Sequence, residues 1–433
     1  MLSALAALAL TAAPTAAGNA PETPIAESGT ESANTSSADA VGPASQPSLP
    51  APPPSESQAK LKLGGAIRAR YDLRFNDAGS DGGRRTSSHL SFDTLLLTAD
   101  YDSSVLFGAA QYRFYGGSFI YGHANGYDNY PGEVSFPVYA YVGAKLNDKQ
   151  KVTVGVQSVP FDDRWWGSAF FNSLGFVYGL EEVYNAGVTF SHKDSALGVD
   201  LGYFPTTAPN AFGISDDSAR FSVNIVKGDS YVPDGSRNAE RNMFVGRVQY
   251  QLASSDHRSL TLSGSAWLST IHNFDTGGNG YRRSYALSLK AESGPWHAKL
   301  LAARQVINPR NEGRSDLITV GDYDSSYNIA ARGNMAFGEM GRTVDTGHLP
   351  FNLNLYANYA RFMKDGSGFR DTERLTLGAF WSDKATGRFR VWSDLMIGRN
   401  DPYVGAGQFL SGAGQGGDGK MKASLIILMG YYF

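Results

Sequence analysis

The chain ends in KASLIILMGYYF, residues 422–433. Every second residue from Ala423 to Phe433 is apolar or aromatic, and Lys422, Ser424 and Gly430 lie in the intervening row. Three further residues weaken the contrast between the two rows: Ile426, Leu428 and Tyr432. A strand that is apolar on one face and ends in aromatic residues predicts the closing strand of a barrel whose outer face contacts lipid. The alternative is a buried strand at the end of a soluble domain.

A second alternating stretch begins at residue 60. One face is apolar and consists of Leu61, Leu63, Ile67, Ala69, Tyr71, Leu73 and Phe75. The opposite face is polar and consists of Lys62, Arg68, Arg70, Asp72 and Arg74. This period of two predicts a strand and excludes a helix. The polar face needs water or opposite charges, and the apolar face needs a dry environment.

The composition permits a barrel and argues against several other classes of protein. The 433 residues include 50 glycines, 23 tyrosines and 24 phenylalanines, which favours many twisted strands with aromatic ends. No apolar run reaches the roughly 18 residues that a transmembrane helix needs. The absence of cysteine argues against disulfides and thiol metal sites. A net charge of −3 gives no support for nucleic acid as a partner.

The first part of the chain predicts export. Residues 1–20 have an apolar core followed by small residues, as in a secretory signal peptide, although no basic residue follows Met1. Residues 21–59 are rich in Pro, Ser and Ala and contain no aromatic residue. Such a segment cannot bury enough surface to fold, so it is predicted to be disordered.

Residues 60–433 predict a barrel of sixteen antiparallel strands, with fourteen or eighteen as alternatives. Short turns rich in Asp, Ser, Lys and Gly alternate with eight longer loops, near 76–88, 116–133, 160–181, 205–240, 273–280, 308–325, 364–371 and 399–419. Sixteen strands leave about 23 residues for each strand and its connection, enough for membrane-spanning strands. Residues 220–227 also have the pattern of a strand, and parity requires them to lie inside an outer loop.

This organisation resembles the Gram-negative outer-membrane porins, in particular the phosphate-selective and carbohydrate porin-like group. The resemblance covers about residues 60–433 and rests on the order of turns and loops, the stretch GLEEVYN at 179–185 and the terminal Phe433. It implies an all-β, transmembrane antiparallel β-barrel in the cell outer membrane, with short periplasmic turns and long outer loops. It also implies a homotrimer in contact with outer-membrane lipid and lipopolysaccharide. No cofactor is expected.

Basic residues are predicted to line the pore. On the polar faces of the strands these are Arg68, Arg70, Arg74, Arg113, Arg247, Arg388 and Arg390. Carboxylates assigned to the same faces are fewer, chiefly Asp72, Asp93, Asp200 and Asp394. A basic channel wall concentrates anions, and guanidinium groups bind carboxylate or phosphate through two hydrogen bonds. Alternatively, the arginines pair with loop carboxylates and stiffen the barrel.

The third long loop, about 159–181, is unusually aromatic for a loop exposed to solvent. Its place after the fifth strand is similar to that of the constriction loop that folds into the lumen of sixteen-stranded porins. By this resemblance Asp162, Asp163 and Arg164 would face the narrowest part of the pore, opposite the basic wall. Trp165 and Trp166, with Phe170 and Phe171, either pack the loop against the wall or stack sugar rings.

The predicted function is a water-filled channel for passive diffusion of small hydrophilic solutes, with a preference for anions. Phosphate, carboxylates and sugars are not ranked by the sequence. The alternatives are a sugar-selective porin with an aromatic track in the third loop, and a non-conducting structural or adhesive barrel. An enzyme is not predicted, because His257 and His272 lie at opposite ends of one predicted strand. No metal-binding His pair and no nucleophile motif is present.

Overall fold

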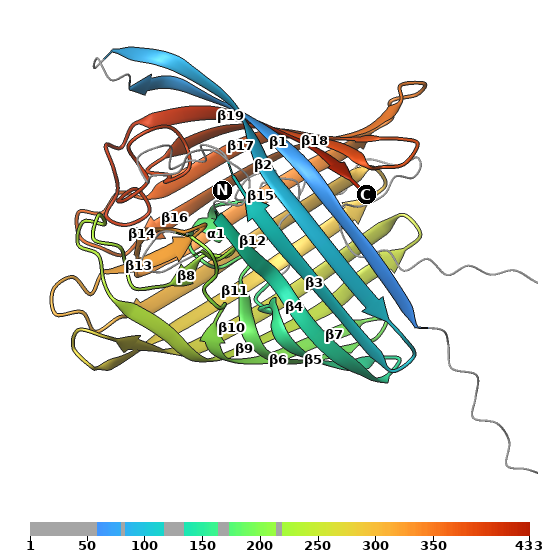
Figure 1. Cartoon of the computed structure of the whole chain (residues 1–433), viewed down its shortest axis with the longest axis horizontal. Coiled ribbons are helices and arrows are strands. Elements are labelled where there is room, and N and C mark those ends of the chain that lie inside the picture. The colour runs from blue at the N-terminus through green and yellow to red at the C-terminus, as the bar shows by residue number, and fades with distance from the viewer. Residues whose placement is uncertain (1–58, 79–82, 117–133, 163–172, 214–218) are drawn as a thin grey trace, which may run out of the picture.

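The structure is a computed structural model that describes residues 59–78, 83–116, 134–162, 173–213 and 219–433. The predicted signal peptide (1–20) lies outside the described residues, as does all of the predicted disordered segment (21–59) except Ala59. The described part forms one closed antiparallel barrel of sixteen strands and a separate three-stranded sheet (Figure 1). The predicted all-β barrel and its strand number are therefore confirmed.

The barrel strands follow one another around the ring in chain order. They are β1 (Lys60–Ala78), β2 (Arg84–Asp102), β3 (Leu106–Tyr115), β4 (Val134–Asn147), β5 (Gln150–Ser158), β6 (Tyr184–Lys193), β7 (Leu197–Thr207), β9 (Asn238–Ser255), β10 (Arg258–Asn273), β11 (Asn279–Ser293), β12 (Trp296–Asn308), β15 (Arg332–Val344), β16 (Phe351–Lys364), β17 (Thr372–Asp383), β18 (Phe389–Arg399) and β19 (Met421–Tyr432).

Strands β1 and β19 close the ring. They pair antiparallel from Ala66, opposite Tyr432, to Phe75, opposite Ala423. Gly65 and Phe433 each donate their N–H to the other's carbonyl at 2.9 Å. Each barrel strand therefore has two hydrogen-bonded neighbours, as a strand in lipid requires, because no water is available there for its backbone groups. The closing role predicted for the C-terminal stretch is confirmed.

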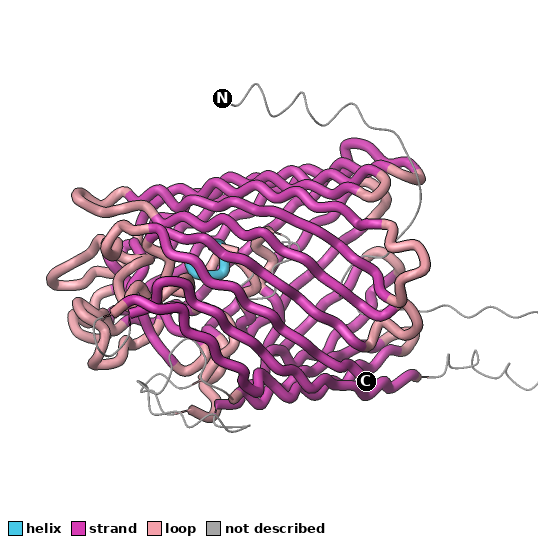
Figure 2. Tube along the Cα trace, turned by 90° about the horizontal axis from the view of Figure 1, so that it is seen from above, coloured by secondary structure: helices cyan, strands magenta, loops and turns pink. Residues whose placement is uncertain are grey.

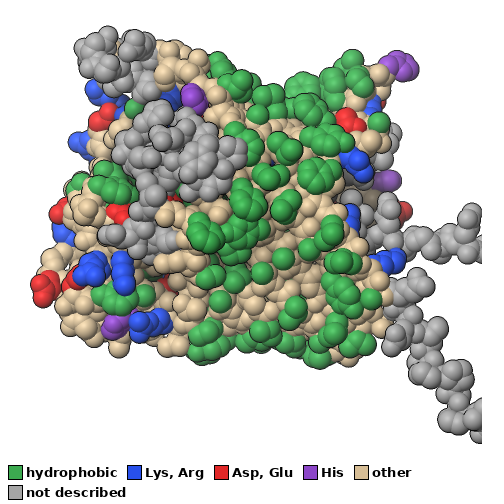
Figure 3. Space-filling model, viewed as in Figure 1, with side chains coloured by type: hydrophobic (Ala, Val, Ile, Leu, Met, Phe, Trp, Pro, Cys, Tyr) green, Lys and Arg blue, Asp and Glu red, His purple; other side chains and the backbone are tan. Residues whose placement is uncertain are grey.

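The outer surface is apolar across the middle of the barrel. Outward-facing side chains remain exposed, for example Leu63 at 71%, Ile67 at 55% and Leu287 at 57%. On the face drawn in Figure 3, hydrophobic side chains cover the wall and charged side chains lie toward its two ends. Because an apolar band of this extent is stable against acyl chains and not against water, the barrel is a transmembrane one.

The two ends of the barrel differ in their connections. Seven short turns, the longest of them 345–350, lie at one end, here called the turn end. The eight remaining connections lie at the other end, here called the loop end, as predicted. The predicted loop at 76–88 is shorter than expected, because β1 and β2 keep pairing as far as Ala78 and Arg84. Residues 220–227 do lie within a loop, where they contain the short strand β8 (Asn224–Ile225).

Connections at the loop end fold back over and into the barrel. The resemblance implied an inward fold for the third loop, but nothing in the sequence indicated it for the other loops. Strand β8 pairs with β13 (Leu317–Asp322), and β13 pairs with β14 (Ser325–Ala330). Helix α1 (Leu174–Val177) lies within the ring of strands, toward the loop end (Figure 2). Among the described residues, no helix has the length and apolar character needed to cross a membrane.

These inserted segments share one apolar core with the inner faces of the strands. Its members come from strands, from α1 and from the long loops, and include Phe136, Phe176, Phe221, Trp267, Ile318, Tyr327, Phe362 and Val404. Hydrophobic burial thus holds the loops inside the barrel near the loop end. The polar inner wall continues from this core toward the turn end.

Candidate functional site: the barrel lumen

The inner face of β1 carries two of the arginines predicted to line the pore. Arg68 pairs with Asp93 of β2, with Nη2 2.9 Å from Oδ2. Arg70 donates from Nε to Asp72 at 2.8 Å, and its Nη1 lies 3.5 Å from Asp93. The side chains of Arg70 and Asp93 are only 1% and 2% exposed. Both arginines are therefore paired, and their carboxylate partners come from strands rather than from loops.

Arg113 of β3 differs from these paired arginines. Its Nε donates to Gln111 at 2.8 Å, and its guanidinium lies 4.7 Å from the centroid of the Phe221 ring. Within the described ranges, no carboxylate forms an ion pair with Arg113. Arg74 lies further along the same face of β1 and is half-buried.

The remaining arginines near β18 lie toward the turn end. Arg390 shares the inner face with Arg68, since both are paired in register with Gly430. Its Nε donates to the carbonyl of Gly387 at 2.9 Å, and its guanidinium lies 4.5 Å from the Tyr432 ring centroid. Arg388 precedes β18 and is exposed in the turn, so it lies at the rim rather than in the wall.

The first described residues of the third loop are bound to the basic wall. The carboxylate of Asp162 lies 2.8 Å from Nζ of Lys299 on β12, and accepts a hydrogen bond from Ser288 of β11 at 2.6 Å. Arg247 of β9 donates to the carbonyl of Asp162 at 2.8 Å while it pairs with Asp200 at the same distance. The structure thus brings Asp162 and Arg247, both predicted site residues, into direct contact.

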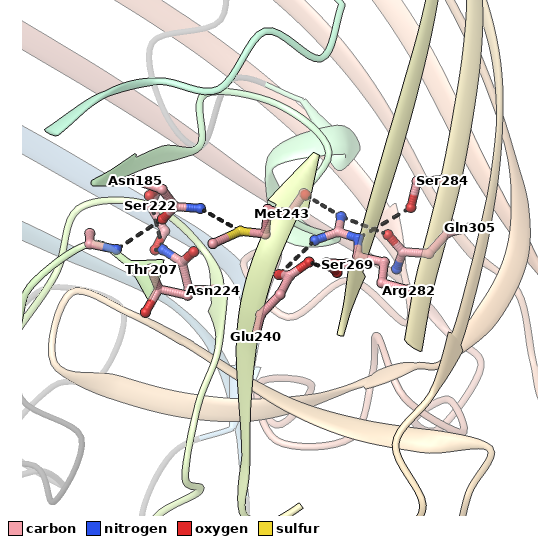
Figure 4. Close-up of polar contacts among 12 residues, drawn as sticks. Asn185, Thr207, Ser222, Asn224, Glu240, Met243, Ser269, Arg282, Ser284 and Gln305 are labelled. Carbon is pink, nitrogen blue, oxygen red and sulfur yellow. Dashed lines mark hydrogen bonds and ion pairs between the residues drawn. The ribbon is translucent and has the colours of Figure 1, made fainter. Parts of the chain in front are cut away.

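The last part of the loop is bound by an arginine that was not predicted (Figure 4). Arg282 of β11 donates to the carbonyl of Gly179 at 2.6 Å and to Oε1 of Gln305 at 3.1 Å. Its Nη1 lies 3.3 Å from the carboxylate of Glu240, and its guanidinium lies 4.0 Å from the Trp267 ring centroid. Because the side chains of Arg282 and Glu240 are 4% and 1% exposed, this anchor is buried.

The described aromatic residues of the loop pack against other rings. Phe161 meets Trp267 edge-on at 5.9 Å between centroids. Tyr178 stacks on Phe362 of β16 at 3.7 Å, and its hydroxyl donates to Thr372. Burial raises the pKa of Tyr178 well above its ordinary value, so the phenol stays protonated as a donor. Phe161 and Tyr178 thus pack the two described ends of the loop against the barrel wall.

The remaining predicted loop residues, Asp163, Arg164, Trp165 and Trp166, lie outside the described residues. So do Phe170 and Phe171, on which the predicted aromatic track for sugars also depends.

Further carboxylates line the inner wall at β15 and β18. Glu339 of β15 accepts a hydrogen bond from Asn358 of β16 at 3.1 Å. Asp394 of β18 accepts one from the hydroxyl of Tyr356. Asp394 was assigned to the wall from the sequence, whereas Glu339 and Glu240 were not. Basic and acidic side chains are therefore interspersed around the inner wall, and Lys299 of β12 lies in register with Glu339 of the neighbouring strand β15.

No family model and no curated protein matches the sequence. Solved structures match its fold. The outer-membrane channel DcaP of Acinetobacter baumannii is 13% identical, with a TM-score of 0.54, and the match covers 87% of this chain and 97% of that one. The fold is that of an outer-membrane β-barrel. The resemblance to outer-membrane porins is confirmed at the level of fold, and with the apolar band so is the predicted outer-membrane location.

Two structures of OmpT from Vibrio cholerae, an outer-membrane protein, also match. A variant without loop L8 is 12% identical, with a TM-score of 0.50, and the match covers 87% of this chain and 99% of that one. The trimer form is 10% identical, with the same score and the same coverage.

Proposed function

We propose that the protein is an outer-membrane porin that passes small hydrophilic solutes by passive diffusion. The observation that carries the proposal is the third loop, whose described ends are bound to the inner wall at Asp162 and Gly179. A closed barrel with an apolar exterior and polar wall needs such an inward segment to narrow its lumen, as expected of a channel. Passage of this kind requires neither a cofactor nor a catalytic group.

The preference for anions is proposed to be modest. Arg68, Arg70 and Arg247 are paired with carboxylates, which lowers the net charge that a solute meets. Arg113 supports the preference, because no carboxylate of the described chain neutralises it. A homotrimer is part of the proposal and is supported by the trimer form of OmpT from Vibrio cholerae.

The test uses the full chain reconstituted in a planar bilayer under a salt gradient. We expect discrete conductance steps and a reversal potential displaced toward the chloride equilibrium potential. Swelling of liposomes that contain the protein, measured with sugars, dicarboxylates and phosphate, then ranks the solutes. An absence of both conductance and swelling would favour the structural or adhesive alternative, and swelling with sugars alone would favour the sugar-selective one.

A further inference from the structure

Arg113 presents an unoccupied hydrogen-bonding fork. Its Nε is bound to Gln111 and one face of its guanidinium is covered by Phe221. In the part of the chain that the structure describes, Nη1 and Nη2 have no acceptor. The side chain is half-buried on the inner face of the barrel. An arginine fork of this kind binds carboxylate through two parallel hydrogen bonds.

Aromatic rings lie beside the fork. The hydroxyl of Tyr139, on the neighbouring strand β4, lies 3.4 Å from Nε2 of Gln111. The Tyr139 ring stacks with Tyr184 at 6.1 Å between centroids and an interplanar angle of 27°. Tyr184 in turn meets Phe221 at 5.6 Å. Arg113 thus lies where the apolar core gives way to the polar lumen, next to the half-exposed rings of Tyr139 and Tyr184.

A carboxylate on the fork would place the body of its molecule against these rings. A flat ring gains offset stacking on tyrosine that an acetate-sized ion cannot gain. Asp100 lies on the same inner face as Gln111. Thr98 is in register with Gln111, and Asp100 is two residues after Thr98 on β2, so the two side chains point the same way. Its charge repels a second negative charge on a ligand, which disfavours dianions.

We propose that Arg113, Gln111 and Tyr139 form a binding site in the lumen for small monocarboxylates that carry a flat ring. This inference rests on the proposed function and names a class of solute for it. The site holds the solute in the channel on its way through, so binding appears as a block of ion current at low solute concentration.

The test measures the concentration of benzoate that halves the current through the reconstituted full chain, with acetate and phosphate as comparison solutes. We expect benzoate to block at lower concentration than either. Arg113→Gln should raise the half-blocking benzoate concentration by about tenfold or more, the loss expected for hydrogen bonds to a charged group. Tyr139→Leu should weaken the block by benzoate and leave that by acetate unchanged.

The matched control is Arg304→Gln on the loop end of β12, whose side chain is 37% exposed and pairs with Asp365. Benzoate should block the current through this variant at the same concentration as in the unmodified protein. The proposed site would be overturned if Arg113→Gln left the half-blocking benzoate concentration unchanged. It would also be overturned if acetate and benzoate blocked the unmodified protein at equal concentrations. Calorimetry of benzoate binding to the detergent-solubilised protein decides the site independently of conductance. If the protein binds benzoate but does not conduct, the result would therefore contradict the proposed function and leave the binding site standing.

Discussion

Arg282 and Glu240 have side chains that are only 4% and 1% exposed, so replacing either one leaves the other as an uncompensated charge. We predict that Glu240→Gln lowers the free energy of unfolding by about 3–5 kcal/mol, the cost of breaking a buried ion pair. Urea unfolding of the barrel refolded in detergent measures it. The control is Asp371→Asn, whose partner Arg361 is 48% exposed, and which should cost less than about 1 kcal/mol. Equal costs would show that burial does not set the strength of these pairs.

The position of Arg282 could have been predicted, but its partner could not. Period-two alternation in β11 puts Arg282 on the same face as Ser284 and Ser288, opposite Leu287. Glu240 is 42 residues away in the sequence, and the register of β9, β10 and β11 decides that the two side chains meet. In the same way, the pattern placed Arg68 on the polar face without revealing that Asp93 neutralises it.

At the scale of the element, the third loop is bound at both described ends by basic side chains. We predict that Lys299→Met, which leaves the buried carboxylate of Asp162 without its cation, frees the start of the loop and increases open-channel current noise. Single-channel recording measures this. Lys290→Met is the control. Lys290 lies directly across from Lys299 on the neighbouring strand β11, but its side chain is 45% exposed and forms its ion pair with Glu292 instead of the loop. Traces that are identical for both variants would exclude an anchoring role for Lys299.

The turn between β6 and β7 predicts a dependence on pH. Asp194 accepts hydrogen bonds from the N–H groups of Leu197 and Ala196, at 2.8 and 2.9 Å, and they lower its pKa below the ordinary 3.8. A lowered folded-state pKa stabilises the protein at pH values above 3.8, and this contribution is lost as the pH falls through the folded pKa. Asp194→Asn should therefore be less stable at neutral pH and approach the unmodified protein in acid. Urea unfolding of both proteins across this pH range checks the prediction. It would be contradicted if their free energies of unfolding differed by the same amount at every pH.

Strand number could be predicted because short turns alternate with longer loops. Eight long loops favoured sixteen strands over fourteen or eighteen, and an even number of strands required residues 220–227 to lie in a loop. The pairing of β8 with β13 could not be predicted. Val320 pairs with Ile225 only because the loops that contain β13 and β8 fold over the same end of the barrel, and no local sequence pattern indicates such a contact. The apolar core that these loops share with the strands escaped prediction for the same reason.

At the scale of the whole molecule, every conclusion depends on one barrel with lipid outside and water inside. The absence of cysteine makes this testable, because a single introduced thiol is the only one present. Leu97 and Thr98 are neighbours on β2: Leu97 is 46% exposed on the outer face, whereas Thr98 pairs with Gln111 on the inner face.

The most direct measurement is the reaction of Leu97→Cys and Thr98→Cys with a charged, membrane-impermeant thiol reagent in proteoliposomes. The thiol at residue 98 should react, since it faces the water-filled lumen, and the thiol at residue 97 should be protected by acyl chains. Protection of residue 98 together with reaction of residue 97, or equal reaction at both, would contradict the barrel as described.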